Sequence, residues 1–363
     1  MLIAFDARPL QGAGSARGIG RYAAELLRAL GKMAPELEFL FIVRAGAPRP
    51  SGLKGRFLML SVRVPERLQG YSDALVLGRI LAQTEARAYH SVEYAMPWRS
   101  PIPALVSVHD LVPWTVRHRS YLRQRVRWAS QVRLLRRADR VLCNSGHTRD
   151  TILERLKVEP ARTEVVYPGV SEIFMQPAPA AGKEAMRGRL GSFVLMVGEC
   201  DWRKRPEHAI ATLARLGEPF RLVITGPNQR HERRLRAMAA ANGVADRLEL
   251  TGVLPDAELA SAYAAARLLL FPSRAEGFGL PVLEAAAQRL PVVAYANTAL
   301  PEICGDAFPL VADGDLDAFR ARAQELLDHA DESAIEAGVA RARSFTWART
   351  AEQVLKSYES LGR

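Results

Sequence analysis

Short apolar segments alternate with amphipathic segments along the whole chain, and this pattern constrains the fold more than any other feature. The apolar segments are rich in valine and leucine without a clean two-residue alternation, which is typical of parallel strands covered by helices on both faces. The first series of expected strands is Leu2–Phe5, Leu37–Val43, Phe57–Val62, Ala88–Val92, Ala104–His109, Arg140–Asn144 and Thr163–Tyr167. The second series is Phe193–Val197, Arg221–Thr225, Leu248–Leu250, Leu268–Phe271 and Pro291–Tyr295. We therefore predict an α/β protein with two Rossmann-like domains whose parallel sheets face each other across a central cleft, where ligands bind at the carboxyl ends of the strands.

The length of 363 residues fits two such domains. Proline, alanine and glycine replace the periodic pattern between the two series, which predicts a linker at residues 173–188. The expected domains are then 1–172, for the acceptor, and 189–345, for the donor. Residues 346–363 predict a helix that packs back on the N-terminal domain. One side of that helix is apolar, with Trp347, Ala351, Val354, Leu355 and Tyr358.

Composition excludes several classes of protein. Hydrophobic residues make up 48% of the chain, which argues against disorder, and no apolar run reaches the roughly 20 residues that cross a bilayer. The N-terminus has no basic segment before its apolar run, so we expect a first strand there and no signal peptide. The cysteines, Cys143, Cys200 and Cys304, are odd in number and far apart. This argues against a disulfide framework and a structural zinc site, and fits a reducing, cytoplasmic location.

The formal net charge of +11 indicates an anionic partner. Nucleic acid is the weakest candidate, because no helix-turn-helix, zinc-finger or RNP-type signature accompanies the charge. Nine arginines and one acid lie in Arg117–Arg140, around a predicted helix at Ser120–Ala138. Its expected apolar stripe comprises Tyr121, Leu122, Val126, Trp128, Ala129, Val132 and Leu135. The opposite, basic face is either solvated or in contact with an anionic membrane surface or a lipid-linked phosphate.

The most informative motif is EGFGLPVLE, which follows the expected strand Leu268–Phe271. Its glycines allow a ligand to approach the backbone closely, and a helix is expected to begin near Leu280, with Pro281 in its first turn. The free amides and the dipole of such a helix start attract phosphate. Glu276 before the helix and Glu284 inside it are expected to project toward the same ligand.

This motif resembles the Glu-x7-Glu element of the retaining GT-B glycosyltransferases of carbohydrate family four (group 1), and the resemblance extends over essentially the whole chain. It implies a GT-B fold and a nucleotide-sugar donor. It also implies that Glu276 contacts the hydroxyls of the donor sugar and that Glu284 holds the ribose hydroxyls. The backbone amides of Phe278, Gly279 and Leu280 would meet the sugar and the phosphate.

The loop between Val197 and Pro206 resembles the family loop that ends in a lysine on the donor diphosphate, and Lys204 is the matching residue. Many members place an arginine directly after the strand glycine, where this chain has Glu199. Either Arg203 or Arg205 would then supply the missing charge. A merely solvated basic loop is the alternative.

Two elements of the first half extend the resemblance. Gly18 and Gly20 belong to a glycine-rich loop like the one that lies over the donor phosphates in this family, although a plain turn explains the glycines equally well. His109 ends an expected strand, and its counterpart in similar enzymes lies beside the transferred sugar. A lone histidine at a strand end is more often structural, and Asp110 could cap the next segment.

The implied reaction is a metal-independent, cofactor-free transfer with retention. The only Asp-x-Asp spacing lies in Asp313–Asp317, where Asp315 is better interpreted as a helix cap; Lys204, an arginine and a helix start can neutralise the leaving diphosphate instead. The resemblance favours mannose or a deoxymannose from a GDP-sugar. The acceptor would be a saccharide or a lipid-linked saccharide of bacterial surface-polysaccharide assembly. The expected location is the cytoplasm, either free or, through the basic helix, peripheral on the inner face of the plasma membrane. A UDP-sugar donor, a related epimerase or phosphorylase, and a non-catalytic nucleotide-sugar-binding protein are the alternatives.

Overall fold

A computed structural model describes the chain except for residues 12–17, 61–67, 117, 227–228, 330 and 362–363. The chain divides into two compact units, Met1–Gly169 with Thr346–Arg363, and Val170–Phe345. Both are parallel sheets with helices on their two faces, so the predicted α/β fold class is confirmed.

Unit 1 contains a seven-stranded sheet of order β3-β2-β1-β4-β5-β6-β7. Its strands are β1 (Leu2–Asp6), β2 (Glu38–Arg44), β3 (Arg56–Leu60), β4 (Ala88–Ser91), β5 (Ala104–Val108), β6 (Arg140–Cys143) and β7 (Thr163–Val165). Its helices are α1 (Gly18–Met33), α2 (Gln69–Leu81), α3 (Val112–Thr115), α4 (Leu122–Leu134), α5 (Gly146–Leu156) and α15 (Trp347–Leu361). Alternate side chains of β1 enter different cores: Ile3 and Phe5 pack with α1 and α15, and Ala4 packs with α2 and α4.

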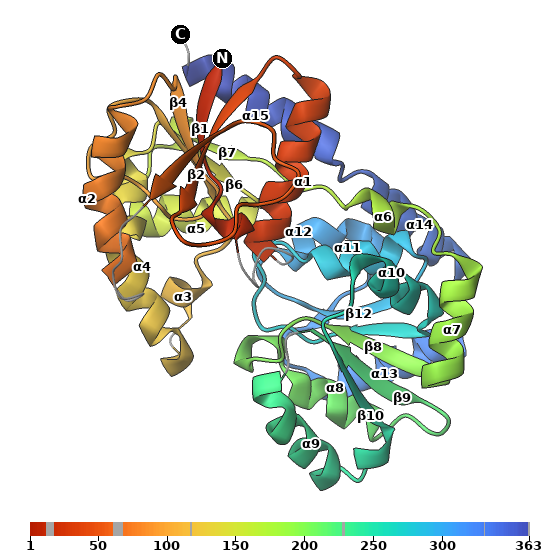
Figure 1. The fold of residues 1–363 in the computed structure, drawn as a ribbon. Coiled ribbons are helices and arrows are strands. Elements are labelled where there is room, and N and C mark those ends of the chain that lie inside the picture. Colours follow the sequence, from red (N-terminus) through yellow and green to blue (C-terminus); the bar gives the residue numbers. More distant parts are fainter. Residues whose placement is uncertain (12–17, 61–67, 117, 227–228, 330, 362–363) are drawn as a thin grey trace. The chain divides into compact units, whose positions relative to one another are not determined.

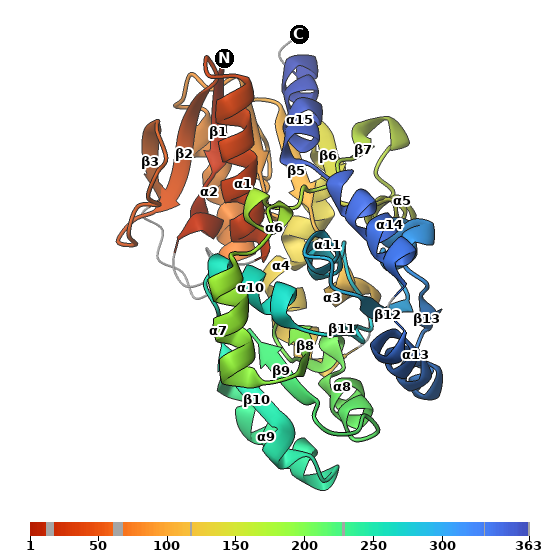
Figure 2. The same cartoon turned by 90° about the vertical axis from the view of Figure 1, so that its right-hand side faces the viewer.

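Helix α15 packs against α1 in unit 1, and the two helices lie side by side in Figures 1 and 2. Its buried side includes the expected Trp347, Ala351, Val354 and Tyr358. The Tyr358 hydroxyl lies 2.6 Å from Nδ1 of His90, whose Nε2 lies 2.9 Å from the Ser107 hydroxyl. This network satisfies polar groups that would otherwise be buried at a cost, and so it fixes the helix on the sheet.

Unit 2 contains a six-stranded sheet of order β10-β9-β8-β11-β12-β13. Its strands are β8 (Phe193–Val197), β9 (Arg221–Thr225), β10 (Leu248–Gly252), β11 (Leu268–Phe271), β12 (Val292–Ala296) and β13 (Val311–Ala312). Its helices are α6 (Glu172–Met175), α7 (Ala180–Leu190), α8 (Pro206–Leu213), α9 (Glu232–Ala241), α10 (Asp256–Ala265), α11 (Leu280–Ala287), α12 (Leu300–Cys304), α13 (Leu316–Asp328) and α14 (Glu332–Arg343). Helices α8, α9 and α13 cover one face of the sheet, and most of the others cover the opposite face.

The prediction of a linker at 173–188 is wrong. This segment forms α6 and most of α7, and it belongs to unit 2. Phe174 is fully buried there against Tyr263. The Gln288 side chain donates hydrogen bonds to the carbonyls of Phe174 and Gln176. Proline and alanine interrupt the sequence pattern, but these anchors make the segment part of a domain core.

The predicted apolar stripe of the basic helix is partly wrong. Tyr121, Trp128, Val132 and Leu135 are buried, but Leu122 and Val126 are 61% and 48% exposed. In their place, the fully buried Gln131 faces the core and bonds to the backbone of Met96 and Gly70. Gly70 is required at this crossing because a Cβ atom would lie 2.3 Å from the Arg127 carbonyl oxygen. The face of α4 that packs on α2 is therefore the one that carries Gln131, and not the one that carries Leu122 and Val126.

No helix in the described ranges is both long and apolar enough to span a membrane. Cys143, Cys200 and Cys304 are buried, and none of them forms a disulfide.

Candidate active site

The turn between β11 and α11 has the geometry expected of a ligand loop. Gly279 adopts a φ of 109°, a conformation that is strained for residues with a side chain, and a Cβ atom there, 2.6 Å from Cδ2 of Leu300, would also force that leucine to shift. Helix α11 begins at Leu280, with Pro281 in its first turn, as predicted. Phe278 is buried edge-to-face against Phe345, with ring centroids 5.5 Å apart. The aromatic anchor fixes the loop, while its glycine leaves the backbone approachable.

Glu276 lies at the centre of a cluster of charges within unit 2. Glu276 is only 7% exposed. It accepts one hydrogen bond from Nζ of Lys204 at 2.6 Å and another from Nη1 of Arg203 at 2.7 Å. Lys204 is also buried, with its ammonium 4.8 Å from the centre of the Phe271 ring. Arg203 and Lys204 are 73 and 72 positions away from Glu276 in the sequence, so spacing along the chain alone does not reveal this site.

Electrostatics keep this cluster charged. Burial on its own would raise the pKa of Glu276, but the charges of Arg203 and Lys204 outweigh it and hold the pKa at about 2. Burial lowers the pKa of Lys204, while the Glu276 charge acts to raise it. Because the Glu276 pKa is depressed on folding, its contribution to stability is complete above the ordinary value of 4.5 and is lost as the pH falls toward 2.

The structure separates the roles of the two arginines that the sequence left open. Arg203 and Lys204 belong to a short 3-10 helix, Trp202–Lys204, whose backbone amides bond to the Asp201 side chain. Arg203 contacts Glu276. Arg205 follows in the left-handed region and turns away, pairing with Asp313 at 2.6 Å. Arg203 is therefore the arginine positioned to share a ligand with Lys204.

Glu284 occupies a different environment from Glu276. It is 3% exposed, and its Oε2 accepts a hydrogen bond from the Tyr263 hydroxyl at 2.9 Å. Tyr263, on α10, is fully buried. A tyrosine partner has no signature in the motif, so sequence reasoning missed it. The expected ribose contact of Glu284 stays a prediction.

Thr298 is the second residue that sequence reasoning missed. Its hydroxyl accepts a hydrogen bond from the backbone amide of Glu276 at 2.9 Å. Its neighbour Asn297 donates to the Ser273 carbonyl at 2.7 Å and to Asp313 at 2.9 Å. These bonds tie the loop before α12 to the loop that carries Glu276.

The remaining predicted residues belong to unit 1. His109 follows β5; its Nε2 lies 2.9 Å from the Val92 carbonyl oxygen, and its ring packs edge-on against Tyr22. Burial lowers the pKa of His109 to about 4, so the ring is neutral at pH 7. The bond to Val92 requires the proton on Nε2 and leaves Nδ1 as an acceptor. Gly18 begins α1 and is exposed, and Gly20 is buried in its first turn; the preceding residues 12–17 lie outside the described ranges.

Two aspartates act as expected from the sequence. Asp315 caps α13 by accepting the Ala318 amide at 3.0 Å, and Asp110 accepts the Val112 amide at the start of α3. Asp313 is engaged by Arg205. No group of three histidine, cysteine, aspartate or glutamate residues in the described ranges could hold a metal ion.

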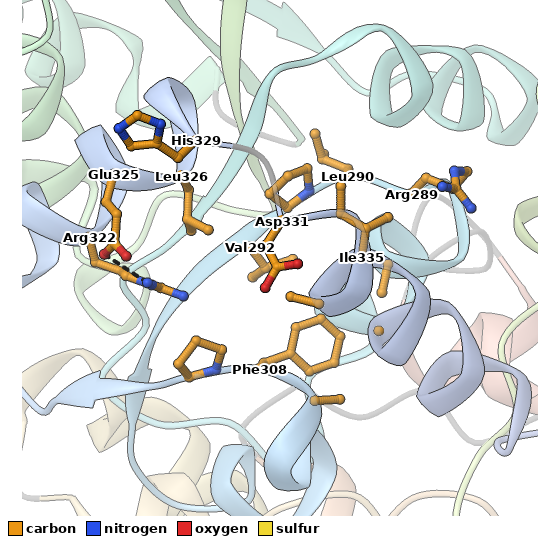
Figure 3. Close-up of a pocket in the computed structure, with 16 residues that line it drawn as sticks. Arg289, Leu290, Val292, Phe308, Arg322, Glu325, Leu326, His329, Asp331 and Ile335 are labelled. Atoms are coloured by element: carbon orange, nitrogen blue, oxygen red, sulfur yellow. Dashed lines mark ion pairs between the residues drawn. The ribbon is translucent and has the colours of Figure 1, made fainter.

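A separate cavity of about 120 Å³ lies in unit 2, lined by Leu290, Val292, Phe308 and Ile335, with Arg322 paired to Glu325 at its edge (Figure 3). None of the predicted site residues lines it. Its volume is also well below the roughly 300–1,000 Å³ of most small-molecule sites. The charge cluster around Glu276 is therefore the better candidate for a nucleotide-sugar site.

Comparison with known proteins gives two family matches. The family described as "Glycosyltransferase Family 4" matches residues 16–172, and "Glycosyl transferases group 1" matches residues 190–338. The chain is 28% identical to O-antigen chain mannosyltransferase B of Escherichia coli, over 95% of this chain and 96% of that protein.

Solved structures share the fold. Sucrose-phosphate synthase from Thermosynechococcus elongatus matches with a TM-score of 0.84 and 21% identity, over 99% of both chains. The Anabaena protein HepE in complex with UDP-glucose matches with a TM-score of 0.76 and 17% identity, over 99% of this chain and 100% of that one. At these identities the likeness concerns the fold alone.

Proposed function

We propose that this chain, which belongs to the group 1, family 4 glycosyltransferases of the GT-B fold, transfers a hexose with retention and without a metal ion from a nucleoside diphosphate to a saccharide or lipid-linked acceptor. One observation carries the proposal. The buried Lys204 and Glu276 and the part-buried Arg203 form a charge cluster directly before the N-terminus of α11. It combines the cations that a diphosphate needs with the carboxylate that sugar hydroxyls need.

The residues divide the chemical work. Lys204, Arg203 and the amides of Phe278–Leu280 neutralise the charge that develops on the leaving diphosphate as the sugar becomes oxocarbenium-like. Glu276 accepts hydrogen bonds from the sugar hydroxyls and orients the sugar without forming a bond to it. His109, neutral at pH 7, offers Nδ1 to a hydroxyl of the transferred sugar.

For the donor, we propose GDP-mannose or a GDP-deoxymannose, used in bacterial surface-polysaccharide assembly. The name of the E. coli relative, a mannosyltransferase of O-antigen chains, supports this choice. The alternative is a UDP-sugar, such as the UDP-glucose in the complex of the fold neighbour HepE.

A donor screen tests the proposal. The purified protein should melt at a higher temperature with GDP-mannose than with UDP-glucose, because a ligand that binds only the folded state stabilises it. It should also release GDP in the presence of an acceptor extract. Stabilisation by UDP-glucose alone would overturn the GDP assignment. Binding of donors without hydrolysis or transfer would favour the non-catalytic alternative.

The exposed face of α4 supports a peripheral location on an anionic membrane at the cytoplasmic side. Leu122 and Val126 are exposed there. The spacing of 3.6 residues per turn places Arg123 and Arg133, which are also exposed, on the same side of α4. The exposed Arg119 lies in the short 3-10 helix that precedes α4. Apolar side chains among arginines are typical of helices that lie in the interface of an anionic leaflet.

We therefore expect the protein to bind vesicles that contain phosphatidylglycerol and not vesicles of pure phosphatidylcholine, with binding that weakens as salt increases. The double variant Leu122→Glu, Val126→Glu should reduce co-sedimentation at least tenfold, since it adds two negative charges to the face. Val253→Glu is the control, because Val253 is similarly exposed on unit 2. Binding that is insensitive to salt or to the double substitution would contradict the membrane contact and would indicate that this face is only solvated.

A further inference from the structure

Thr298 adopts a backbone conformation that its side chain disfavours. Its φ is +45°, and among the described non-glycine residues with positive φ it is the only β-branched one. Such residues in the left-handed region are genuine outliers, and this kind of strain gathers at functional sites. Glycine would adopt the same conformation without strain. The presence of threonine therefore requires a contribution from its side chain.

The contribution visible in the structure is a hydrogen bond between the Thr298 side chain and the backbone of Glu276. The Thr298 hydroxyl accepts the Glu276 amide at 2.9 Å and donates to Oδ1 of Asn297 at 3.3 Å. The Glu276 backbone is thus held from one side by Thr298, while its carboxylate is held from the other by Lys204 and Arg203.

The same bonds continue to the loop that carries the lysine. Asn297 donates to Asp313 at 2.9 Å, and Asp313 accepts from Arg205 at 2.6 Å. Arg205 is adjacent to Lys204 and 6% exposed. One chain of hydrogen bonds therefore connects both sides of the charge cluster, so a displacement of Thr298 would move Glu276 relative to Lys204.

We infer that Thr298 is a positioning residue for sugar transfer, whose hydroxyl holds Glu276 in register with the donor sugar at the expense of backbone strain. This inference rests on the proposed function of the Glu276 site. It adds that the strained threonine, and not only the Glu-x7-Glu motif, determines the turnover of the bound sugar.

Three substitutions separate the hydroxyl from the strain. Thr298→Val keeps the branched shape and removes the hydrogen bond, so kcat should fall at least tenfold, because small displacements of a positioning group cost one to two orders of magnitude. Thr298→Ser keeps the hydroxyl and should stay within about threefold of wild type. Thr298→Gly removes both the hydroxyl and the backbone strain. It should therefore melt at a higher temperature than Thr298→Val, while its kcat falls by a similar factor.

Lys157→Gly provides the matched control for strain. Lys157 also has a positive φ, of 53°, but it ends α5 on the surface of unit 1. Its replacement should change melting temperature alone and leave kcat unchanged.

The measurements are kcat with GDP-mannose or UDP-glucose, whichever the wild type uses, and calorimetry with the free nucleoside diphosphate and with the nucleotide sugar. Thr298→Val should weaken nucleotide-sugar binding and leave diphosphate binding unchanged. A kcat of Thr298→Val within twofold of wild type, or no rescue by Thr298→Ser, would overturn the inference while the transferase function stands. A wild type that neither transfers sugar nor binds a nucleotide sugar would instead refute the proposed function itself.

Discussion

Glu276→Gln should lower turnover by about a thousandfold and leave nucleoside diphosphate binding unchanged or tighter. The loss of turnover follows from removing the charged acceptor that orients the sugar. The unchanged or tighter binding follows from the ion pairs that Glu276 forms with both Lys204 and Arg203. A diphosphate must take these cations from the carboxylate, and glutamine competes for them less.

The matched comparison is Glu284→Gln, a change of the same chemistry eight residues along the motif. Glu284 bonds to Tyr263 and not to the cations. If it also grips the ribose, its substitution should weaken the binding of every nucleotide and spare turnover at saturating donor. Single-turnover kinetics and calorimetry with GDP and UDP measure both effects. Near-wild-type turnover in Glu276→Gln would contradict the orienting role of Glu276. A large loss of diphosphate affinity in the same variant would contradict the exchange of ion pairs.

The features that depend on local sequence could be predicted. Hydrophobic patterning predicts the strands of both sheets except β13, which has only two residues. The helix start at Leu280, the tight turn at Gly279 and the Asp315 cap follow from the demands of positive φ and from capping chemistry. The family resemblance predicts that Lys204 and Glu276 lie in one site. Their distance of 2.6 Å then came from the fold.

The features that depend on tertiary contacts could not be predicted. The sequence offers Arg203 and Arg205 equally, and only the left-handed turn at Arg205 directs one to Glu276 and the other to Asp313. The role of Thr298 could not be predicted, because no residue near it in the sequence indicates a positive φ at this position.

The predictions of the orientation of α4 and of a linker at residues 173–188 were wrong for the same reason. The stripe around Leu122 followed ideal periodicity, but contacts with a neighbouring helix determine which residues of α4 face the core. Residues 173–188 looked like a linker because burial of Phe174 is a property of the folded unit.

Substitution of Lys204 should abolish the preference of the site for diphosphates. Wild type should bind GDP or UDP about tenfold to a hundredfold more tightly than GMP or UMP without added magnesium. One or two charge-assisted hydrogen bonds to the second phosphate have that value. Lys204→Met keeps an apolar stem over Phe271 but removes the ammonium, so it should erase most of the difference, and Lys204→Ala should do so with some loss of stability. Arg233→Ala is the charge-matched control, since Arg233 is an exposed residue of α9 in the same unit.

Calorimetry of wild type and the three variants against mono- and diphosphates measures the preference directly. Equal affinities in wild type, or an absolute need for a divalent ion, would mean that Lys204 and the start of α11 do not form the phosphate clamp. A preference that survives in Lys204→Met would transfer the role to Arg203, the remaining cation on Glu276.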